Sequence, residues 1–578
     1  MVGRLRPGAT DGGAARELDS ISAHAEGRKT APPFQALVTP PSGLTRFQDT
    51  LKLLAAAVAM VLIIACANVA HLLLARGATR QREMAIRAAV GAGRARMMRQ
   101  LLTESLVLAA GGGVVGMLVG WGALRTLVAL RPNSLSQLST AHMDGRTLLV
   151  AAGLAGITGI VFGVIGAMQA SRLSSPEILR VGVPTSLGPA HDRLRSLLVV
   201  TEMALSTALL VGAALFIRSV ANLQMTDPGF RADGLYSVDV NLAATSDTTT
   251  DRRWNFFGRI AEQAKALPGV DGVTLATAAP PGQSFSIGNL QTDDQPLPPD
   301  GSSFISVLGV HPEYFGVMGI RIVQGTTFTD TTAAAGQVII NEGMARKFWP
   351  AGSAVGHRLR VEMGGHGDWL TVVGVATNAA TGGLTMEASE PMLYEAPSTW
   401  FSPVLIVRTS RPTTVLPAIR HMIESANAAI PPANINSITD AMMSTIALPR
   451  FTMRLLAVFT GLALVLAAVG LYGVMAYGVT QRTREIGIRI ALGATAGNIA
   501  RSVLGRGLAL VLVGMVLGLV AANWGTQLIA KMLTGVTTRD PASFAVAACV
   551  LMATAAIASV VPMRRPMQVE PVVAMRAD

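Results

Sequence analysis

The chain of 578 residues has few charged residues, few aromatic residues and only two cysteines. Charged residues make up 14% and aromatic residues 5% of the sequence, whereas hydrophobic residues make up 50%. A soluble globular protein carries about a quarter of its residues as charged ones, so this composition argues against that class. Cys66 and Cys549 both lie inside apolar runs, which argues against a disulfide framework.

A phosphate-binding P-loop is also missing. The motif requires a lysine that follows a glycine. The lysines of this chain all follow other residues: Lys29, Lys52, Lys265, Lys347 and Lys531. The chain therefore does not hydrolyse ATP by that route, and we expect any ATPase that drives it to be a separate chain.

Residue groupings typical of an enzyme or a metal site are absent from the sequence as well. Histidines in the polar parts of the chain show no metal-ligand spacing: His142, His191, His357 and His366. No Ser/His/Asp grouping stands out between residues 219 and 450. We therefore expect a protein that is not an enzyme, with no catalytic residues, no metal and no cofactor.

Long apolar runs are abundant. Seven segments are apolar and long enough to cross a hydrocarbon core of about 30 Å as helices of about 20 residues. They cover approximately residues 51–75, 105–129, 147–170, 197–217, 455–479, 507–530 and 543–562. Few ionisable residues lie in them. For Glu104, Glu202 and His71 we favour interfacial or helix-packing roles over proton transport, which needs buried acids near the midplane.

The formal net charge of +12 is distributed as the positive-inside rule predicts. Arginines cluster in short stretches beside the apolar runs, and no basic face of a soluble domain indicates nucleic acid. One alternation of the chain satisfies all of these clusters. It places residues 76–99, 172–195, 480–506 and the C-terminus in the cytoplasm, and residues 1–46, 131–146, 219–450 and 531–540 outside.

The large outside region, residues 219–450, has a mixed α/β pattern. Residues 270–275 and 369–375 are rich in β-branched side chains, which predicts strands. Residues 252–267 and 414–426 have helical periodicity.

A thirteen-residue element occurs twice, at residues 80–92 and again 402 residues later at 482–494, with eight identical positions. At the same offset a ladder of small residues recurs: Gly112, Gly116 and Gly120, then Gly514, Gly518 and Ala522. Such ladders let helices approach closely in lipid, so we predict that these five glycines face another helix of the chain. The alternative is that they face lipid and reflect a glycine-rich composition.

Several of these stretches resemble a known family. Residues 485–494, Glu-Ile-Gly-Ile-Arg-Ile-Ala-Leu-Gly-Ala, resemble the signature of FtsX-like permease domains. Residues 63–76 and 227–230 resemble the acidobacterial duplicated orphan permeases. Region 219–450 is similar to the periplasmic core domain of MacB-type macrolide exporters, through residues 312–315, 349–350 and 372–375.

The resemblance implies a fold and a division of the chain. We expect a polytopic α-helical membrane protein of about seven transmembrane helices, with two FtsX-like repeats and one α+β MacB-like periplasmic core domain, in the cell (inner) membrane. The expected parts are a remnant of a first extracytoplasmic domain (1–46), a first repeat (47–175), a cytoplasmic linker (176–196), a helix opening the second repeat (197–218), the core domain (219–450) and the rest of the second repeat (451–578). We expect the chain to be N-terminally truncated, because the first repeat has three spans and the second has four.

In this family the repeated element forms coupling helices that dock on an ATPase. As helices, the copies here place Glu83 four residues before Arg87, and Glu485 four before Arg489, a favourable pairing worth about 0.2–0.5 kcal/mol each. A short amphipathic helix could also merely anchor the loop on lipid. The residues expected to dock are Arg82, Glu83, Arg87, Gly91, Arg484, Glu485, Ile486, Arg489 and Gly493.

Three functions remain open on the sequence. The leading one is the permease subunit of an ABC-type mechanotransmission or export system, which couples a separate ATPase dimer to movement of the outside domain. Its further partners would be membrane lipids and an extracytoplasmic adaptor or substrate. The second is a non-transporting scaffold or sensor that regulates an extracytoplasmic partner. The third is an ATP-independent secondary transporter, which the scarcity of midplane charge disfavours.

Overall fold

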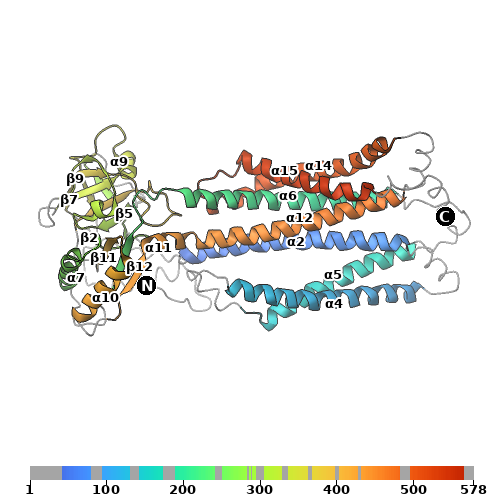
Figure 1. Ribbon diagram of the computed structural model, residues 1–578. Helices are drawn as coiled ribbons and strands as arrows, with labels where there is room; N and C mark the ends of the chain where they lie inside the picture. The colour runs from blue at the N-terminus through green and yellow to red at the C-terminus, as the bar shows by residue number, and fades with distance from the viewer. Residues whose placement is uncertain are drawn as a thin grey trace, which may run out of the picture. The chain divides into compact units, whose positions relative to one another are not determined.

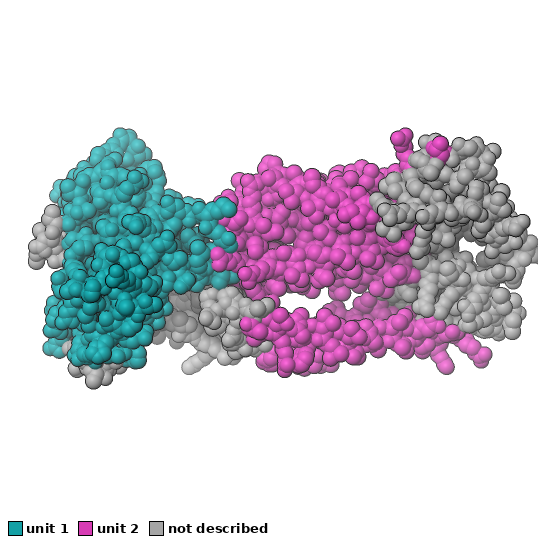
Figure 2. All heavy atoms as spheres, in the orientation of Figure 1, with its two compact units in different colours: residues 1–44, 223–447 teal, residues 45–222, 448–578 magenta. Residues whose placement is uncertain are grey.

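A computed structural model describes residues 42–79, 94–129, 142–172, 189–240, 250–282, 285–287, 290–293, 305–328, 336–361, 368–396, 403–426, 431–481 and 495–564. The chain divides into two compact units, coloured separately in Figure 2. The helical unit contains residues 45–222 and 448–578, and the α/β unit contains residues 1–44 and 223–447.

Long helices make up the described part of the helical unit (Figure 1). In chain order they are α2 (Ser42–Thr79), α4 (Arg94–Ala129), α5 (Gly145–Arg172), α6 (Pro189–Met225), α12 (Ala447–Gln481), α14 (Ala496–Leu528), the short 3₁₀ helix η4 (Ala530–Met532) and α15 (Pro541–Arg564).

Six of the described helices are long and apolar enough to cross a membrane: α2, α4, α6, α12, α14 and α15. They coincide with six of the seven predicted spans. The seventh predicted span, residues 147–170, lies in the 28-residue helix α5, whose described apolar part, Gly145–Ile160, is shorter than the other six.

Helix α6 is the most enclosed of these helices. Half of its most apolar stretch is buried inside the protein, whereas none of the corresponding stretch of α4 is. One core joins α6 to α12, α14 and α15 through residues such as Val199, Leu471, Val511 and Leu551. A second core joins α6 to α2 and α12. Helices α6 and α12 therefore both contribute to the two cores.

Helices α4 and α5 pack mainly on each other, through small side chains. A Cβ at Gly113 would lie 3.5 Å from the Cβ of Ala155, and a Cβ at Gly159 would lie 2.6 Å from the Cβ of Ala109. Two alanine–glycine contacts one helical turn apart bring the two backbones close together.

The α/β unit contains two sheets. The smaller has the order β12-β1-β11-β2 and is antiparallel throughout. Its strands are β1 (Leu235–Asp239), β2 (Val270–Ala276), β11 (Val404–Thr409) and β12 (Asn434–Ser437). Helices α7 (Thr250–Lys265) and α10 (Pro412–Ala426) cover one face, where their apolar stripes pack on Leu405 and Val407. The predicted strands at 270–275 and 369–375 and the predicted helices at 252–267 and 414–426 are all present.

The larger sheet has the order β3-β5-β10-β7-β9-β8-β4, with β6 paired to β9. Its strands are β3 (Phe285–Ile287), β4 (Leu290–Thr292), β5 (Ile305–Gly309), β6 (Ile322–Gly325), β7 (Gln337–Asn341), β8 (Arg358–Val361), β9 (Trp369–Ala376) and β10 (Met392–Glu395). Only the β5–β10 and β7–β9 pairs are parallel among the described strands. Helix α9 (Glu342–Phe348) follows β7 and packs on this sheet.

A core of aromatic residues lies between the two sheets. Helix α8 (Tyr314–Met318) contributes Tyr314 and Phe315, whose rings meet Tyr394 of β10 at centroid distances of 6.1 and 5.2 Å. The short helix α11 (Ile438–Thr445) closes the same core with Ile438 and Met442. The stretch 312–315, which carries part of the family resemblance, is thus a structural element of the α/β unit.

The turn at residues 227–230, which also carries the resemblance, requires its glycine. Gly229 has a φ of +76°, and a Cβ there would collide with the carbonyl group of Asn378. Its N–H group donates to the side chain of Asp227 at 2.9 Å, and Phe230 enters the aromatic core.

We predict that Gly229→Ala lowers the free energy of unfolding of the α/β unit by about 1–3 kcal/mol, because alanine is strained at this φ and lacks space. Limited proteolysis of the purified full chain during heating measures the effect. The control is Gly258→Ala in α7, where the structure has open space and helix propensity favours alanine. Equal protease resistance of both variants would contradict the argument.

Candidate functional site

The first feature of the site is the close contact of α14 with α6. A Cβ at Gly514 would lie 2.5 Å from the Cβ of Met203 and 2.7 Å from the carbonyl oxygen of Val200. A Cβ at Gly518 would lie 2.5 Å from the carbonyl oxygen of Ala204. No real Cβ fits at such distances, so two successive glycines bring the α14 backbone directly against α6.

The first copy of the glycine ladder is placed differently. A Cβ at Gly112 or Gly116 would meet no atom within 4 Å in the described structure, and one at Gly120 would only touch Met143 at 3.6 Å. The prediction that Gly112 and Gly116 pack on a helix of this chain therefore needs correction. The stripe of α4 that contacts α5 is the neighbouring one, which contains Gly113, because Ala155 and Gly159 of α5 meet that stripe.

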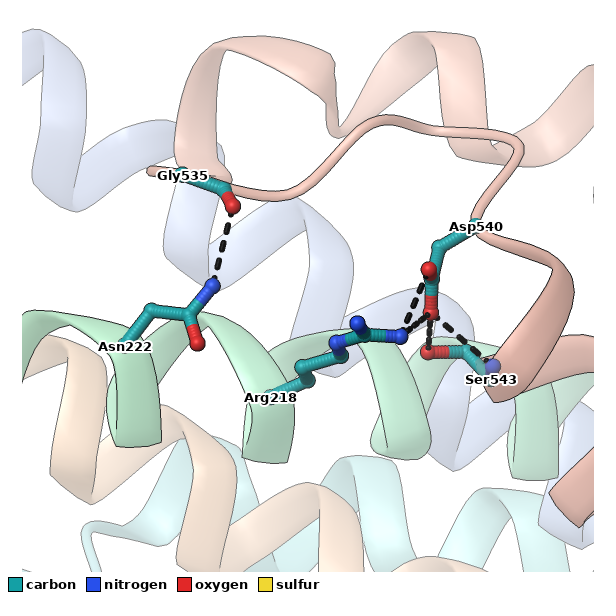
Figure 3. A network of polar contacts seen from close by, with 5 residues as sticks. All are labelled: Arg218, Asn222, Gly535, Asp540 and Ser543. Carbon is teal, nitrogen blue, oxygen red and sulfur yellow. Dashed lines mark hydrogen bonds and ion pairs between the residues drawn. The ribbon is translucent and has the colours of Figure 1, made fainter.

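The second feature is an ion pair near the end of α6 (Figure 3). The guanidinium group of Arg218 donates to both carboxylate oxygens of Asp540, each at 2.6 Å. Asp540 lies in the connection between α14 and α15, 322 residues away in sequence. Its side chain is 12% exposed and that of Arg218 is 46% exposed. The pair therefore fixes the end of α6 to the α14–α15 connection.

Asp540 also begins helix α15. It precedes Pro541, the first helical residue, and its Oδ2 accepts from the backbone N–H of Ser543 at 2.9 Å and from the Ser543 hydroxyl at 2.6 Å. An aspartate before a proline is a favourable helix start. The Ser543 hydroxyl, together with Arg218, holds the pKa of the Asp540 carboxyl below its ordinary value of 3.8. The carboxylate therefore stays ionised at neutral pH.

Two further contacts extend the ion pair along α6. The Ser219 hydroxyl donates to the carbonyl oxygen of Thr534 at 3.1 Å and accepts from the Thr534 N–H at 2.9 Å. The side chain of Asn222 donates to the carbonyl oxygen of Gly535 at 2.9 Å. We call Arg218, Ser219, Asn222 and the segment 534–543 the α6 clamp. It holds one helix by three successive polar contacts and contains no group arranged for chemistry on a substrate.

Sequence reasoning missed the α6 clamp, although two signals were present. Arg218 directly follows an apolar span on its outer side, where the positive-inside rule disfavours an arginine and an acidic partner is needed. Asp540-Pro541 before an apolar run is a helix-start signal.

All nine predicted docking residues, Arg82, Glu83, Arg87, Gly91, Arg484, Glu485, Ile486, Arg489 and Gly493, lie outside the described residues. Among the residues that the structure does describe, no group of three or more His, Cys, Asp or Glu side chains could hold a metal ion.

Comparison with known families identifies both units. The FtsX-like permease C-terminal family matches residues 55–175 and again residues 457–571. The MacB-like periplasmic core domain family matches residues 196–442. The chain is an FtsX-like permease with a MacB-like periplasmic core domain. It belongs with the ABC transporter permeases of the MacB and YknZ kind, and is a multi-pass membrane protein with a periplasmic domain.

Two curated relatives illustrate the similarity. The macrolide export ATP-binding/permease protein MacB of Chromobacterium violaceum is 28% identical over 235 residues, which are 39% of this chain and 35% of that protein. The uncharacterized ABC transporter permease YknZ of Bacillus subtilis is 26% identical over 246 residues, which are 39% of this chain and 58% of that protein. The chain thus spans about a third to just over half of these relatives. The name of the first includes an ATP-binding part, whereas the families matched here are a permease and a periplasmic domain.

Two solved structures of periplasmic or extracellular domains match part of the chain. The match with the periplasmic region of MacB from Actinobacillus actinomycetemcomitans covers 39% of this chain and 97% of that structure, with 14% identity and a TM-score of 0.26. The extracellular domain of YknZ from Gram-positive bacteria covers 35% of this chain and 100% of its own, with 17% identity and a TM-score of 0.25.

We predict that Gly518→Leu lowers the free energy of unfolding of the detergent-extracted chain by about 1–3 kcal/mol or more, because leucine forces α14 away from α6. Gly116→Leu, at the matched position of the first ladder, has open space and should melt like the parent. Thermal unfolding of the three proteins, measured side by side, checks this. Equal losses in both variants would contradict the assignment of the contact to the second ladder alone.

Variants at Asp540 separate the two roles of this residue. Asp540→Ala removes both the helix cap and the charge-assisted bonds to Arg218, and we expect a loss of about 1–2 kcal/mol. Asp540→Asn keeps a good capping residue and removes only the charge, so we expect a smaller loss. Thermal unfolding in detergent measures both. If the alanine variant melts like the parent, the α6 clamp does not hold the helix.

Proposed function

We propose that the chain is the transmembrane subunit of an ABC-type mechanotransmission or export system. ATP binding and hydrolysis by a separate ATPase dimer would move the periplasmic domain through the membrane helices. The observation that carries the proposal is helix α6, a single helix of 37 residues that is shared by both cores of the helical unit.

Its contacts suit a part that transmits force. Gly514 and Gly518 place α14 against the middle of α6, and the α6 clamp holds it near its end. An axial displacement of α6 therefore displaces α14 and the start of α15 with it. A helix held only by exposed side chains would instead slide past its neighbours.

Short covalent connections join the helices to the periplasmic domain. Helix α6 ends at Met225 and the first strand begins at Leu235. On the return, α11 ends at Thr445 and α12 begins at Ala447. Only Ile446 lies between α11 and α12, so a movement of α12 would reach the last helix of the domain directly. The nine residues between α6 and the first strand can extend to about 30 Å and transmit movement less tightly.

In this proposal the ATPase docks on the two copies of the repeated element of this chain. Each copy follows a long helix: 80–92 follows α2, and 482–494 follows α12. Both helices pack on α6. A push on either copy would thus reach α6 through one helix, which supports the copies as the two receivers of an ATPase dimer.

Charge reversal tests the proposal. The ATPase is first identified by pull-down of the tagged chain from native membranes, and its activity is then measured with the chain reconstituted in lipid. We predict that Glu485→Lys and Glu83→Lys each lower the permease-dependent part of the ATPase rate several-fold, because each replaces an attractive pair by a repulsive one and alters the docking face.

The control is Glu424→Lys, a charge reversal at an exposed position of helix α10 in the periplasmic domain, which should leave the rate unchanged. An ATPase rate that neither Glu485→Lys nor Glu83→Lys changes would show that the repeated elements only anchor. A pull-down that yields an extracytoplasmic partner and no ATPase would favour the scaffold or sensor.

A further inference from the structure

One titratable group of the helical unit has no role in the proposed function. Glu202 lies on α6, and its side chain is fully buried. Neither carboxylate oxygen has a hydrogen-bond partner in the described structure within ordinary hydrogen-bond geometry. An ionised carboxylate without donors in a helix bundle costs several kcal/mol. The protein therefore needs a way to keep this carboxyl group neutral or paired.

The partner in reach is His71 of α2. Its Nδ1 lies 3.5 Å from Oε1 of Glu202, and its side chain is 5% exposed. The other ring nitrogen, Nε2, lies 3.4 Å from the carbonyl oxygen of Arg195. Because a carbonyl oxygen only accepts, Nε2 carries a hydrogen atom. In a neutral ring Nδ1 is then a bare acceptor that faces the carboxyl group.

This geometry needs one proton between the two groups. With no proton, a lone pair of Nδ1 would face a carboxylate oxygen. With two, the ring would carry a positive charge in a buried place with no anion to balance it. With one proton, a hydrogen bond forms. A proton on the carboxyl group leaves both buried side chains neutral, whereas a proton on the ring leaves two buried charges, so the carboxyl group is the better place for the proton.

Among the described residues, the groups of the neighbouring helices that lie against Glu202 are uncharged. Gly470 of α12 lies against the carboxyl group, where a Cβ would collide with Oε2 of Glu202 and lie 2.9 Å from Oδ1 of Asn68. The side-chain N–H groups of Asn68 in α2 donate to the carbonyl oxygens of Leu466 and Ile64, at 2.9 and 3.2 Å. Gly514 of α14 packs on Val200 and Met203 of α6, on either side of Glu202 in sequence, and as a glycine it adds no side chain there.

We propose that Glu202 and His71 form a proton-binding site inside the membrane, in which the protonated Glu202 carboxyl donates to Nδ1 of His71. The site joins α2, which belongs to the first FtsX-like segment, to α6. Release breaks the carboxyl O–H bond and gives the proton to water, and uptake reverses this. If α2 and α6 separate during the cycle, the carboxyl group loses its acceptor and meets water, so that its proton can leave.

The test is infrared spectroscopy of the full chain in lipid nanodiscs with ¹³C-carboxyl-labelled glutamate. We expect the C=O stretch of a protonated glutamate at neutral pH, shifted by the label, which shows that the band belongs to a glutamate. The band should disappear in Glu202→Gln, whose amide can still donate to Nδ1. It should stay in Glu104→Gln, the matched change at another membrane-helix glutamate. In His71→Gln it should shift, because the acceptor has changed.

Stability against pH gives an independent reading. Above pH ~6.5 the unfolded chain holds no proton on these two residues, whereas the folded site holds one. The equilibrium constant for folding should therefore fall as pH rises above that value, by up to tenfold per pH unit, until the folded site itself loses its proton. Glu202→Gln should remove this slope and Glu104→Gln should keep it.

Absence of a protonated glutamate band in the wild-type chain would overturn the proposal. So would a band that persists in Glu202→Gln. If Glu202→Gln fails to fold, the labelled wild-type chain and His71→Gln still decide, since an unshifted band in His71→Gln would also overturn it. None of these measurements uses an ATPase, so their failure and the failure of the proposed function are separate results.

Discussion

The helical unit depends on one constraint: in lipid, two apolar helices gain no hydrophobic free energy by coming together. What holds them is close packing and a small number of polar contacts. Helix α6 has both. Gly514 and Gly518 let the backbone of α14 lie directly against α6, and the ion pair of Arg218 with Asp540 fixes the end of α6. Helix α4, none of whose most apolar stretch is buried, exposes its apolar residues as a lipid-facing helix does.

Two polar contacts of α6 do different things. At the end of the helix, Arg218 is half exposed and can bind water when the contact opens, and Asp540 keeps its hydrogen bond to the Ser543 N–H. Within the span, Glu202 and His71 are buried, and the described structure offers them no ordinary hydrogen bond between the carboxyl group and Nδ1. A contact of the first kind can break at modest cost, whereas one of the second kind cannot break without a change of charge or hydration. The second kind therefore specifies an arrangement more than it stabilises one.

Apolar periodicity and charge distribution were enough to predict the spans, the periplasmic domain and several of its elements, such as the strand at 270–275 and the helix at 414–426. These features depend on local pattern. The α6 clamp joins residues 322 positions apart, and no local pattern connects Arg218 to Asp540. For Glu202 the sequence predicts an interfacial or helix-packing role, because the residue lies near the cytoplasmic end of its span. Burial is decided instead by which helices surround α6.

The glycine ladders show the limit of duplication as evidence. Both copies keep small residues at the same offset, yet within the described part of the chain only Gly514 and Gly518 of the ladders meet another helix, while α4 uses the stripe of Gly113. A glycine permits close approach but supplies no attraction, so the partner helix decides whether the contact forms. Ala155 and Gly159 of α5 provide that partner surface, and they meet Gly113 and Ala109 of α4, one position away from the ladder. Sequence identity between repeats thus predicts the element, whereas the contact has to be established for each copy from its neighbours.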